Sequence, residues 1–140
     1  MELTRNISIV NKIAETVQVT EIIESTAQEA GFAQKDIYDI LIAVDEILSN
    51  IVYYAYEEGE EGQIEIRMIY SDKSLRLEFI DEGREFNPLI KSDPDLSIPP
   101  EEREIGGLGI FIVKKLMDSV VYSREGKRNI LKITKTKTGE

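Results

Sequence analysis

The segment "QKDIYDILIAVDEILSNIVYYAY" (residues 34–56), followed closely by "QIEIRMIYSDKSLRLEFI" (residues 63–80), decides the fold class. The second segment alternates apolar and polar residues on either side of an "SDKS" turn, which is the pattern of an antiparallel hairpin with one buried face. The first segment predicts a long amphipathic helix, for which Asp36 is a candidate N-cap. Its apolar residues share one stripe at helical spacing: Ile37, Ile40, Leu41, Val44, Leu48, Ile51, Val52 and Ala55.

The rest of the chain supplies further elements of both kinds. Residues 2–9 predict a short strand, residues 11–30 a helix that Gly31 ends, and residues 108–119 another helix. Two strands, 119–125 and 129–137, close the chain around a "GKRN" turn. We expect one domain over residues 1–140, an α+β two-layer sandwich with helices on one face of a mixed, mostly antiparallel sheet. The inward residues expected of the two further helices are Ile13, Val17, Thr20, Ile23 and Ala27, then Ile110, Val113, Leu116 and Met117.

The composition restricts the chemistry. The chain has no Cys and no His, which excludes thiol nucleophiles, imidazole bases and conventional zinc sites. Its net charge is −10, and no basic cluster is interleaved with aromatic residues, so we expect no direct nucleic-acid binding. No apolar run is long enough for a membrane span and no signal-type segment opens the chain, so we expect a cytoplasmic protein without membrane contact. Magnesium held by oxygen ligands remains possible.

Two polar motifs lie before and at the start of the long loop of residues 81–105, which holds all four prolines. Glu46 and Asn50 are four residues apart, so they share the polar face of the predicted helix, which points away from the sheet. Asp81 ends a strand and Gly83 follows it. The simple interpretations are a solvent-facing helix surface and a turn in which Asp81 accepts from the backbone and Gly83 supplies a positive φ. The functional alternative has Asp81 accept a hydrogen bond from an exocyclic amine while Gly83 lets a flat ring approach the backbone.

A third motif, "GGLG" at residues 106–109, stands directly before a predicted helix. Free backbone N–H groups and a partial positive charge make a helix N-terminus attractive to phosphate, and glycines let an anion approach it closely. The same residues would also serve as a hinge or a tight helix entry. No Lys-Ser/Thr follows them and no strand precedes them, so they form neither a Walker A loop nor a dinucleotide fingerprint.

Taken in order, the three motifs resemble those of the Bergerat-fold, or GHKL, ATP-binding domains, and most closely the anti-sigma factor serine kinases of the RsbW type. "AVDEILSNIVYYAY" (43–56) is similar to their first box, "DEGREFNP" (81–88) to their second and "GGLGIFIVKKLMDSVVY" (106–122) to their third. The resemblance covers nearly the whole chain. One departure is Tyr54, which stands where these kinases commonly have His.

The resemblance implies a role for each motif residue. Glu46 would be the catalytic base toward a serine hydroxyl or would position the nucleophile, and Asn50 would hold Mg²⁺ against the phosphates of ATP. Asp81 would read the adenine amine, with Gly83 packed beside the base. Arg103 would be the candidate cation near the γ-phosphate. The other nucleotide-site residues would be Phe86, Gly106, Gly107, Leu108 and Gly109, with Gly107 and Gly109 in a lid over the triphosphate.

The function that follows from the resemblance is phosphoryl transfer from ATP, in the presence of Mg²⁺, to a protein serine. The expected partners are a STAS-type anti-sigma factor antagonist as the substrate, a sigma factor as the binding partner, and a second copy of the chain in a homodimer. The alternative is a non-catalytic regulatory module in which ATP only orders the loop of residues 86–105.

Overall fold

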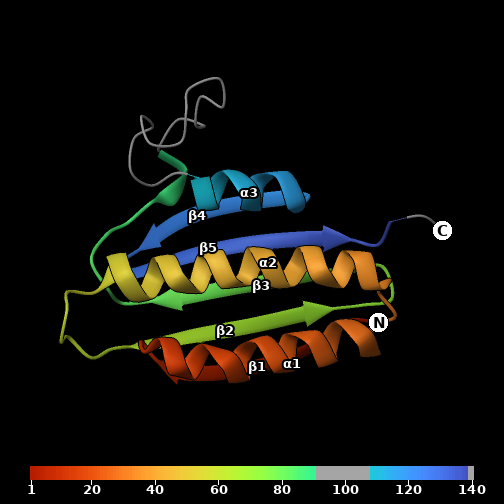
Figure 1. Cartoon of the computed structure of the whole chain (residues 1–140), viewed down its shortest axis with the longest axis horizontal. Coiled ribbons are helices and arrows are strands. Elements are labelled where there is room, and N and C mark those ends of the chain that lie inside the picture. The colour runs from red at the N-terminus through yellow and green to blue at the C-terminus, as the bar shows by residue number, and fades with distance from the viewer. Residues whose placement is uncertain (91–107, 139–140) are drawn as a thin grey trace.

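The computed structural model describes residues 1–90 and 108–138 (Figure 1). Arg103, Gly106 and Gly107 therefore lie outside the described residues, as does most of the predicted long loop. The elements, in chain order, are β1 (Leu3–Val10), a 3₁₀ turn (Ile13–Glu15), α1 (Thr16–Glu29), α2 (Gln34–Asn50), a π-helical turn (Ile51–Ala55), β2 (Gln63–Tyr70), β3 (Ser74–Asp81), a 3₁₀ turn (Pro88–Ile90), α3 (Leu108–Leu116), β4 (Ser119–Glu125) and β5 (Arg128–Thr136).

The five strands form one sheet in the order β1-β2-β3-β5-β4, and every pairing in it is antiparallel. The three helices lie together on one face of this sheet (Figure 1). The predicted α+β two-layer architecture is therefore confirmed. The register places Asp81, the last residue of β3, opposite Asn129 on β5, and this pairing becomes important at the site.

The core lies between α2 and the inward face of the central strands. Ile40 and Val44 of α2 are fully buried, as are Ile66, Leu77 and Phe79 of the sheet. Burying an aliphatic or aromatic side chain of this kind contributes about 1.5–3 kcal/mol. In β2 the burial alternates as predicted, whereas β3 is buried at every residue from Leu77 to Asp81; the hairpin presents its apolar face to the helices.

The predicted inward stripe of α1 is partly wrong. Val17 is 59% exposed and Ile13 is 41% exposed, whereas Val19 is fully buried. Ile13 lies in the 3₁₀ turn that precedes α1, so it does not share the face of the helix. Val17 lies within α1 but off its buried stripe, which consists of Val19, Ile23, Thr26 and Ala27. Gly31 ends the helix region with a φ of 87°, as expected for a glycine stop.

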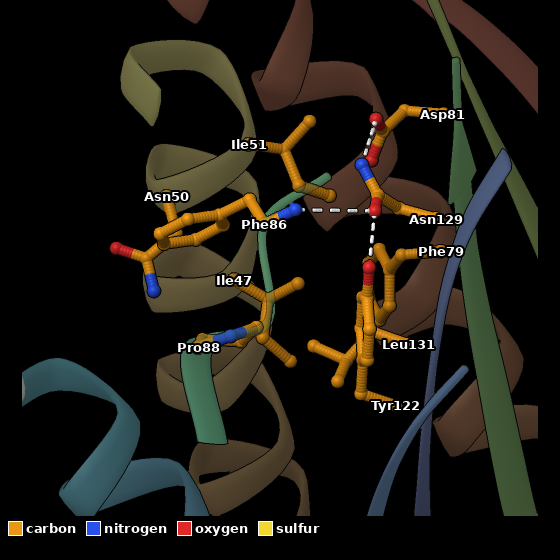
Figure 2. A pocket seen from close by; sticks show the side chains of 10 residues that line it. All are labelled: Ile47, Asn50, Ile51, Phe79, Asp81, Phe86, Pro88, Tyr122, Asn129 and Leu131. Carbon is orange, nitrogen blue, oxygen red and sulfur yellow. Dashed lines mark hydrogen bonds between the residues drawn. The ribbon is translucent and has the colours of Figure 1, made fainter. Parts of the chain in front are cut away.

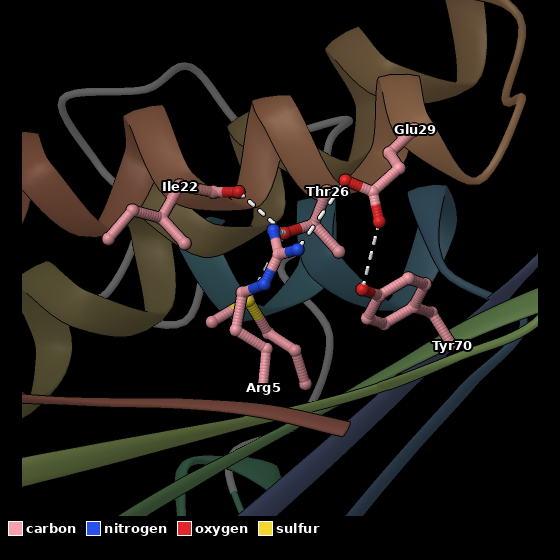
Figure 3. A network of polar contacts seen from close by, with 6 residues as sticks. Arg5, Ile22, Thr26, Glu29 and Tyr70 are labelled. Carbon is pink, nitrogen blue, oxygen red and sulfur yellow. Dashed lines mark hydrogen bonds and ion pairs between the residues drawn. The ribbon is translucent and has the colours of Figure 1, made fainter. Parts of the chain in front are cut away.

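A polar network holds α1 against the sheet (Figure 3). Arg5 of β1 donates from Nη1 to Oγ1 of the buried Thr26 at 2.7 Å, and the Thr26 hydroxyl donates to the carbonyl of Ile22. Tyr70 of β2 donates to Glu29 at 3.1 Å, and Arg5 also lies over the Tyr70 ring. Thr26 can therefore be buried on the inward face of α1, because its hydroxyl both accepts and donates a hydrogen bond.

Asp36 does not cap α2, contrary to the prediction. Ala33 occupies the cap position and makes no side-chain cap hydrogen bond. Asp36 lies one turn later, is 1% exposed, and accepts hydrogen bonds from the backbone N–H and the hydroxyl of Thr138. Its partner, Thr138, is 102 positions away in the sequence, and local sequence rules do not predict contacts at such a separation. Within residues 1–90 and 108–138, no helix has both the length and the apolar character required to cross a bilayer.

Candidate functional site

The end of α2 is joined tightly to the turn that follows β3. The carbonyl oxygen of Ala55, in the π-helical turn, accepts a hydrogen bond from the N–H of Arg84 at 2.9 Å. A methyl group built on Gly83 would lie only 2.3 Å from this same oxygen. Gly83 does not adopt a positive φ, so the predicted reason for this glycine is wrong. Glycine is required here because two backbone segments approach each other closely.

Ten residues from distant parts of the chain line a narrow pocket between α2 and the sheet (Figure 2). Helix α2 and its π-helical extension supply one wall, the inward faces of β3, β4 and β5 supply another, and the segment after β3 closes it. Three of the predicted site residues, Asn50, Asp81 and Phe86, meet here. The other lining residues are Ile47, Ile51, Phe79, Pro88, Tyr122, Asn129 and Leu131.

Asp81 is the acidic group of this pocket and is 3% exposed. Its Oδ1 accepts hydrogen bonds from the N–H of Gly83 and from Nδ2 of Asn129, both at 2.9 Å, so the predicted turn at Asp81 is confirmed. No group within the described part of the chain donates to its second oxygen, Oδ2. Burial raises the pKa of Asp81, while the hydrogen bonds from Asn129 and Gly83 and the charge of Arg124 act in the opposite direction. An ionised carboxylate in this setting is a strong acceptor for an amine.

Asn129 is a site residue that sequence reasoning missed. It is 4% exposed and lies at the centre of the polar contacts in Figure 2. Its amide nitrogen donates to Asp81 and to the carbonyl of Arg84, and its amide oxygen accepts from Tyr122, Arg124 and the N–H of Phe86. A signal was present, because Asn129 is a polar residue on the same inward face of β5 as the buried Leu131 and Ile133.

Glu46 and Asn50 do not simply face water. Helix α3 packs beside α2, and its first turn covers Glu46 so closely that a methyl group built on Gly109 would lie 2.3 Å from Oε2. Leu108 opens α3. The carboxylate of Glu46 therefore stands between the pocket wall that carries Asn50 and the N-terminal turn of α3, where helix backbone N–H groups attract anions.

Tyr54 packs against Phe86, with ring centroids 5.7 Å apart and an angle of 31° between the ring planes. Phe86 is also held through its backbone N–H, which donates to Asn129 at 3.3 Å. The carbonyl of Tyr54 accepts a hydrogen bond from Nε of Arg84 at 2.6 Å. Tyr54 therefore supports the segment that closes the pocket, which gives this residue a role of its own in this chain.

A wider and more polar hollow borders Asp81 from another direction. Four glutamates contribute to its lining, and they are Glu60, Glu61, Glu65 and Glu82. Such a concentration of negative charge repels a phosphorylated ligand. The pocket that carries Asn50 has Asp81 as its single acidic lining residue, so we take it as the candidate site.

Comparison with known proteins gives concordant results. Residues 9–135 match the family model described as the histidine kinase-like ATPase domain. The serine-protein kinase RsbW of Listeria monocytogenes is 37% identical over 106 residues, which is 71% of this chain and 67% of that protein. The RsbW of Bacillus cereus is 36% identical over 110 residues, covering 75% of this chain and 68% of that protein.

A solved structure supports the fold. The crystal structure of the RsbU and RsbW domains of a Mycobacterium tuberculosis protein matches 95% of this chain with a TM-score of 0.67. The identity is 18%, and the present chain spans only 32% of that longer one. The likeness therefore concerns the architecture of the sheet and its helices.

Proposed function

This chain belongs to the histidine kinase-like ATPase domain family and is a protein serine kinase related to the RsbW kinases, and on this premise we propose that its pocket binds ATP with Mg²⁺. We further propose that it transfers the γ-phosphoryl group to a serine of a small partner protein. The observation that carries the proposal is the meeting of Asn50, Asp81 and Phe86 in one pocket, with Glu46 one helical turn before Asn50.

The pocket has the chemistry that an adenine ring requires. Ile47, Ile51, Phe79 and Leu131 offer apolar surface to the faces and edges of a flat ring. Oδ2 of Asp81 offers one acceptor within this apolar surface, as the exocyclic amine of adenine requires. Gly83 allows the chain after β3 to lie directly against the end of α2, which keeps this wall of the pocket in place.

Magnesium fits the amide of Asn50. This side chain lines the pocket and points away from the cluster around Asn129, so its oxygen is available to a cation (Figure 2). Within residues 1–90 and 108–138, no cluster of three or more His, Cys, Asp or Glu side chains could hold a metal ion. A single protein oxygen matches the usual way of binding Mg²⁺ at a nucleotide, in which phosphate oxygens and water supply most of the ligands. When bound, the ion neutralises charge on the phosphates during transfer.

Glu46 is the proposed base. The serine oxygen forms a bond to the γ-phosphorus, the bond from that phosphorus to the bridging oxygen breaks, and ADP leaves with that oxygen. The serine proton passes to the carboxylate of Glu46. A carboxylate removes this proton late in the transfer, so the side chain acts mainly by position, and general bases of this kind contribute about 10² to 10⁴ in rate.

The proposed partners extend the relationship to the RsbW kinases. We propose a STAS-type anti-sigma factor antagonist as the substrate, a sigma factor as the binding partner, and a homodimer as the functional unit. The cytoplasm is the proposed location because a sigma factor acts there. The affinity for a partner in the presence of ATP is a different quantity from the rate of phosphoryl transfer, so the two are measured separately.

A transfer assay tests the proposed function. The full chain is incubated with Mg²⁺, ATP labelled at the γ-phosphate and a purified STAS-type antagonist, and labelled serine in the antagonist is measured. We expect transfer by the wild type and loss of transfer in Glu46→Gln, with ATP binding retained. Transfer at the wild-type rate by Glu46→Gln would overturn the assignment of the base. Binding of ATP without any transfer would instead favour a regulatory module.

A further inference from the structure

We infer that Asn129 makes this pocket selective for a base with an exocyclic amine, by fixing Asp81 and without contacting the base itself. The inference deepens the proposed function and rests on it. It makes Asn129 a positioning residue for nucleotide choice.

The hydrogen-bonding capacity of Asn129 is fully used within the protein. Its two amide hydrogens are directed to Oδ1 of Asp81 at 2.9 Å and to the carbonyl oxygen of Arg84 at 2.8 Å. Its oxygen accepts three hydrogen bonds, from the hydroxyl of Tyr122, from Nη1 of Arg124 at 3.1 Å and from the N–H of Phe86 at 3.3 Å. Nothing remains with which Asn129 could bind a nucleotide base.

These contacts also determine which way the amide faces. Rotating the amide of Asn129 by half a turn would direct its N–H groups at two groups that can only donate, Nη1 of Arg124 and the N–H of Phe86, and its oxygen at two acceptors. The buried position leaves no water to compensate for such mismatches, so only one orientation is satisfied. The N–H group that Asn129 directs at Asp81 is therefore a fixed feature of the pocket.

The fixed N–H group orients the carboxylate of Asp81. Together with the N–H of Gly83, it occupies Oδ1, so Oδ2 is the oxygen left for a ligand. An ionised Oδ2 can only accept a hydrogen bond. It suits the amine at position 6 of adenine and repels the carbonyl oxygen that hypoxanthine and guanine carry at that position.

The charge state of Asp81 depends on the same contact. Burial opposes ionisation of Asp81, and the hydrogen bond from Asn129 is the largest influence that lowers its pKa. The other groups facing Asp81 are Arg124 and Tyr122 on β4, Tyr56 at the end of the π-helical turn, and the adjacent Glu82. Without the amide, Asp81 takes up a proton more readily, and a protonated Asp81 can donate to a carbonyl at position 6.

Comparison of ATP with inosine triphosphate (ITP) tests the inference, because adenine carries an amine at position 6 where hypoxanthine carries a carbonyl oxygen, with a proton on the neighbouring N1. Equilibrium binding of each nucleotide with Mg²⁺ is measured at pH 8 and pH 6 for the wild type, Asn129→Leu and Asn6→Leu. We expect the wild type to prefer ATP at both pH values. In Asn129→Leu, the ratio of the dissociation constants of ITP and ATP should fall by at least about tenfold, with the larger fall at pH 6. Asn6→Leu, the same substitution at an exposed position of β1 outside the pocket lining, is the matched control and should keep the preference.

A second variant keeps the test decisive if Asn129→Leu does not fold. In Asp81→Asn, the N–H groups of Asn129 and Gly83 hold the new amide oxygen at the Oδ1 position and direct its NH₂ group at the ligand. This variant should therefore bind ITP more tightly than ATP. An unchanged ratio in both Asn129→Leu and Asp81→Asn, or equal binding of the two nucleotides by the wild type, would overturn the inference. Failure of the wild type to bind any nucleotide would overturn the proposed function instead.

Discussion

The carboxylate of Glu46 on α2 lies directly against Gly109 in the first turn of α3. A methyl group at Gly109 would stand 2.3 Å from Oε2 and 3.2 Å from Cδ of Glu46. Within residues 1–90 and 108–138, the atoms that such a methyl group would meet closely belong to the flexible end of this side chain. The contact therefore links the glycine-rich entry of α3 to the position of the proposed base.

Gly109→Ala should impair phosphoryl transfer more than folding. The added methyl group displaces the carboxylate of Glu46, which can move without disturbing the core, so the free energy of unfolding should change by less than about 1 kcal/mol. The transfer rate should fall about 10²-fold as the base is misplaced. Urea denaturation and the transfer assay measure the two effects.

A double-mutant cycle separates this effect from any contact between Gly109 and nucleotide. In the Glu46→Ala background the obstacle to the methyl group is gone, so Gly109→Ala should cause little further loss of transfer. If the two substitutions reduce the rate independently, Gly109 acts through something other than Glu46.

Glu46→Gln should abolish most transfer while ATP affinity stays within about twofold of the wild type. The amide keeps the size of the side chain and cannot take up the serine proton, which removes about 10² to 10⁴ in rate. Single-turnover transfer and calorimetric ATP binding provide the measurements. A parallel loss of ATP affinity would show that Glu46 serves binding instead.

Asn50→Ala should remove the dependence of ATP binding on Mg²⁺. The wild type is expected to bind ATP more tightly with Mg²⁺ than without it, because the amide oxygen of Asn50 supplies a protein ligand to the nucleotide-bound ion. Calorimetric titration with and without Mg²⁺ measures the difference. Ser49→Ala, one position earlier and outside the pocket lining, is a suitable control. Persistence of the full magnesium effect in Asn50→Ala would exclude this residue as a ligand.

Asp81→Asn should stabilise the protein at neutral pH relative to the wild type, although it alters the site. Burial raises the pKa of Asp81 in the folded state above its pKa in the unfolded state. At pH values between these two pKa values, the folded protein therefore binds more protons than the unfolded protein. The wild type therefore loses stability as the pH rises through the folded pKa, and the variant avoids this loss. Urea denaturation from pH 4 to pH 8 should show an advantage for the variant that disappears toward pH 4.

Thr138→Val should lower the free energy of unfolding by about 1–2 kcal/mol. Its hydroxyl donates to the carboxylate of Asp36, which is 1% exposed, and hydrogen bonds to buried charges are stronger than average. Thr136→Val, at an exposed position on the same strand end, makes the matched control. Equal effects of the two substitutions in urea denaturation would contradict a specific role for the contact between Thr138 and Asp36.

Local periodicity was sufficient to predict most of the architecture. The alternation in β2 and β3 and the stripe on α2 arise from the burial of one face, so they appear in the sequence itself. The buried face of α1 was predicted only in part, because Val17 fits helical spacing as well as Val19 does, and because Ile13 belongs to a 3₁₀ turn before the helix. The role of Asp36 depends on Thr138, 102 positions away in the sequence, and local capping rules carry no information about such a partner.

The residues of the candidate site were also predictable only in part. The motifs around Asn50 and Asp81 could be identified because their residue types and order are distinctive. The reason for Gly83 could not, since it depends on the carbonyl of Ala55 reaching the turn after β3. Asn129 was missed because its importance lies in contacts with β3, the segment after β3 and β4, and only its inward position on β5 indicated it.

A crystal structure of the protein with Mg²⁺ and a non-hydrolysable ATP analogue tests the central claim most directly. The account predicts the adenine amine at Oδ2 of Asp81, the ion at the amide oxygen of Asn50, and the γ-phosphate beside the carboxylate of Glu46 and the first turn of α3. A purine bound elsewhere, or phosphates directed away from Asn50 and Glu46, would contradict it.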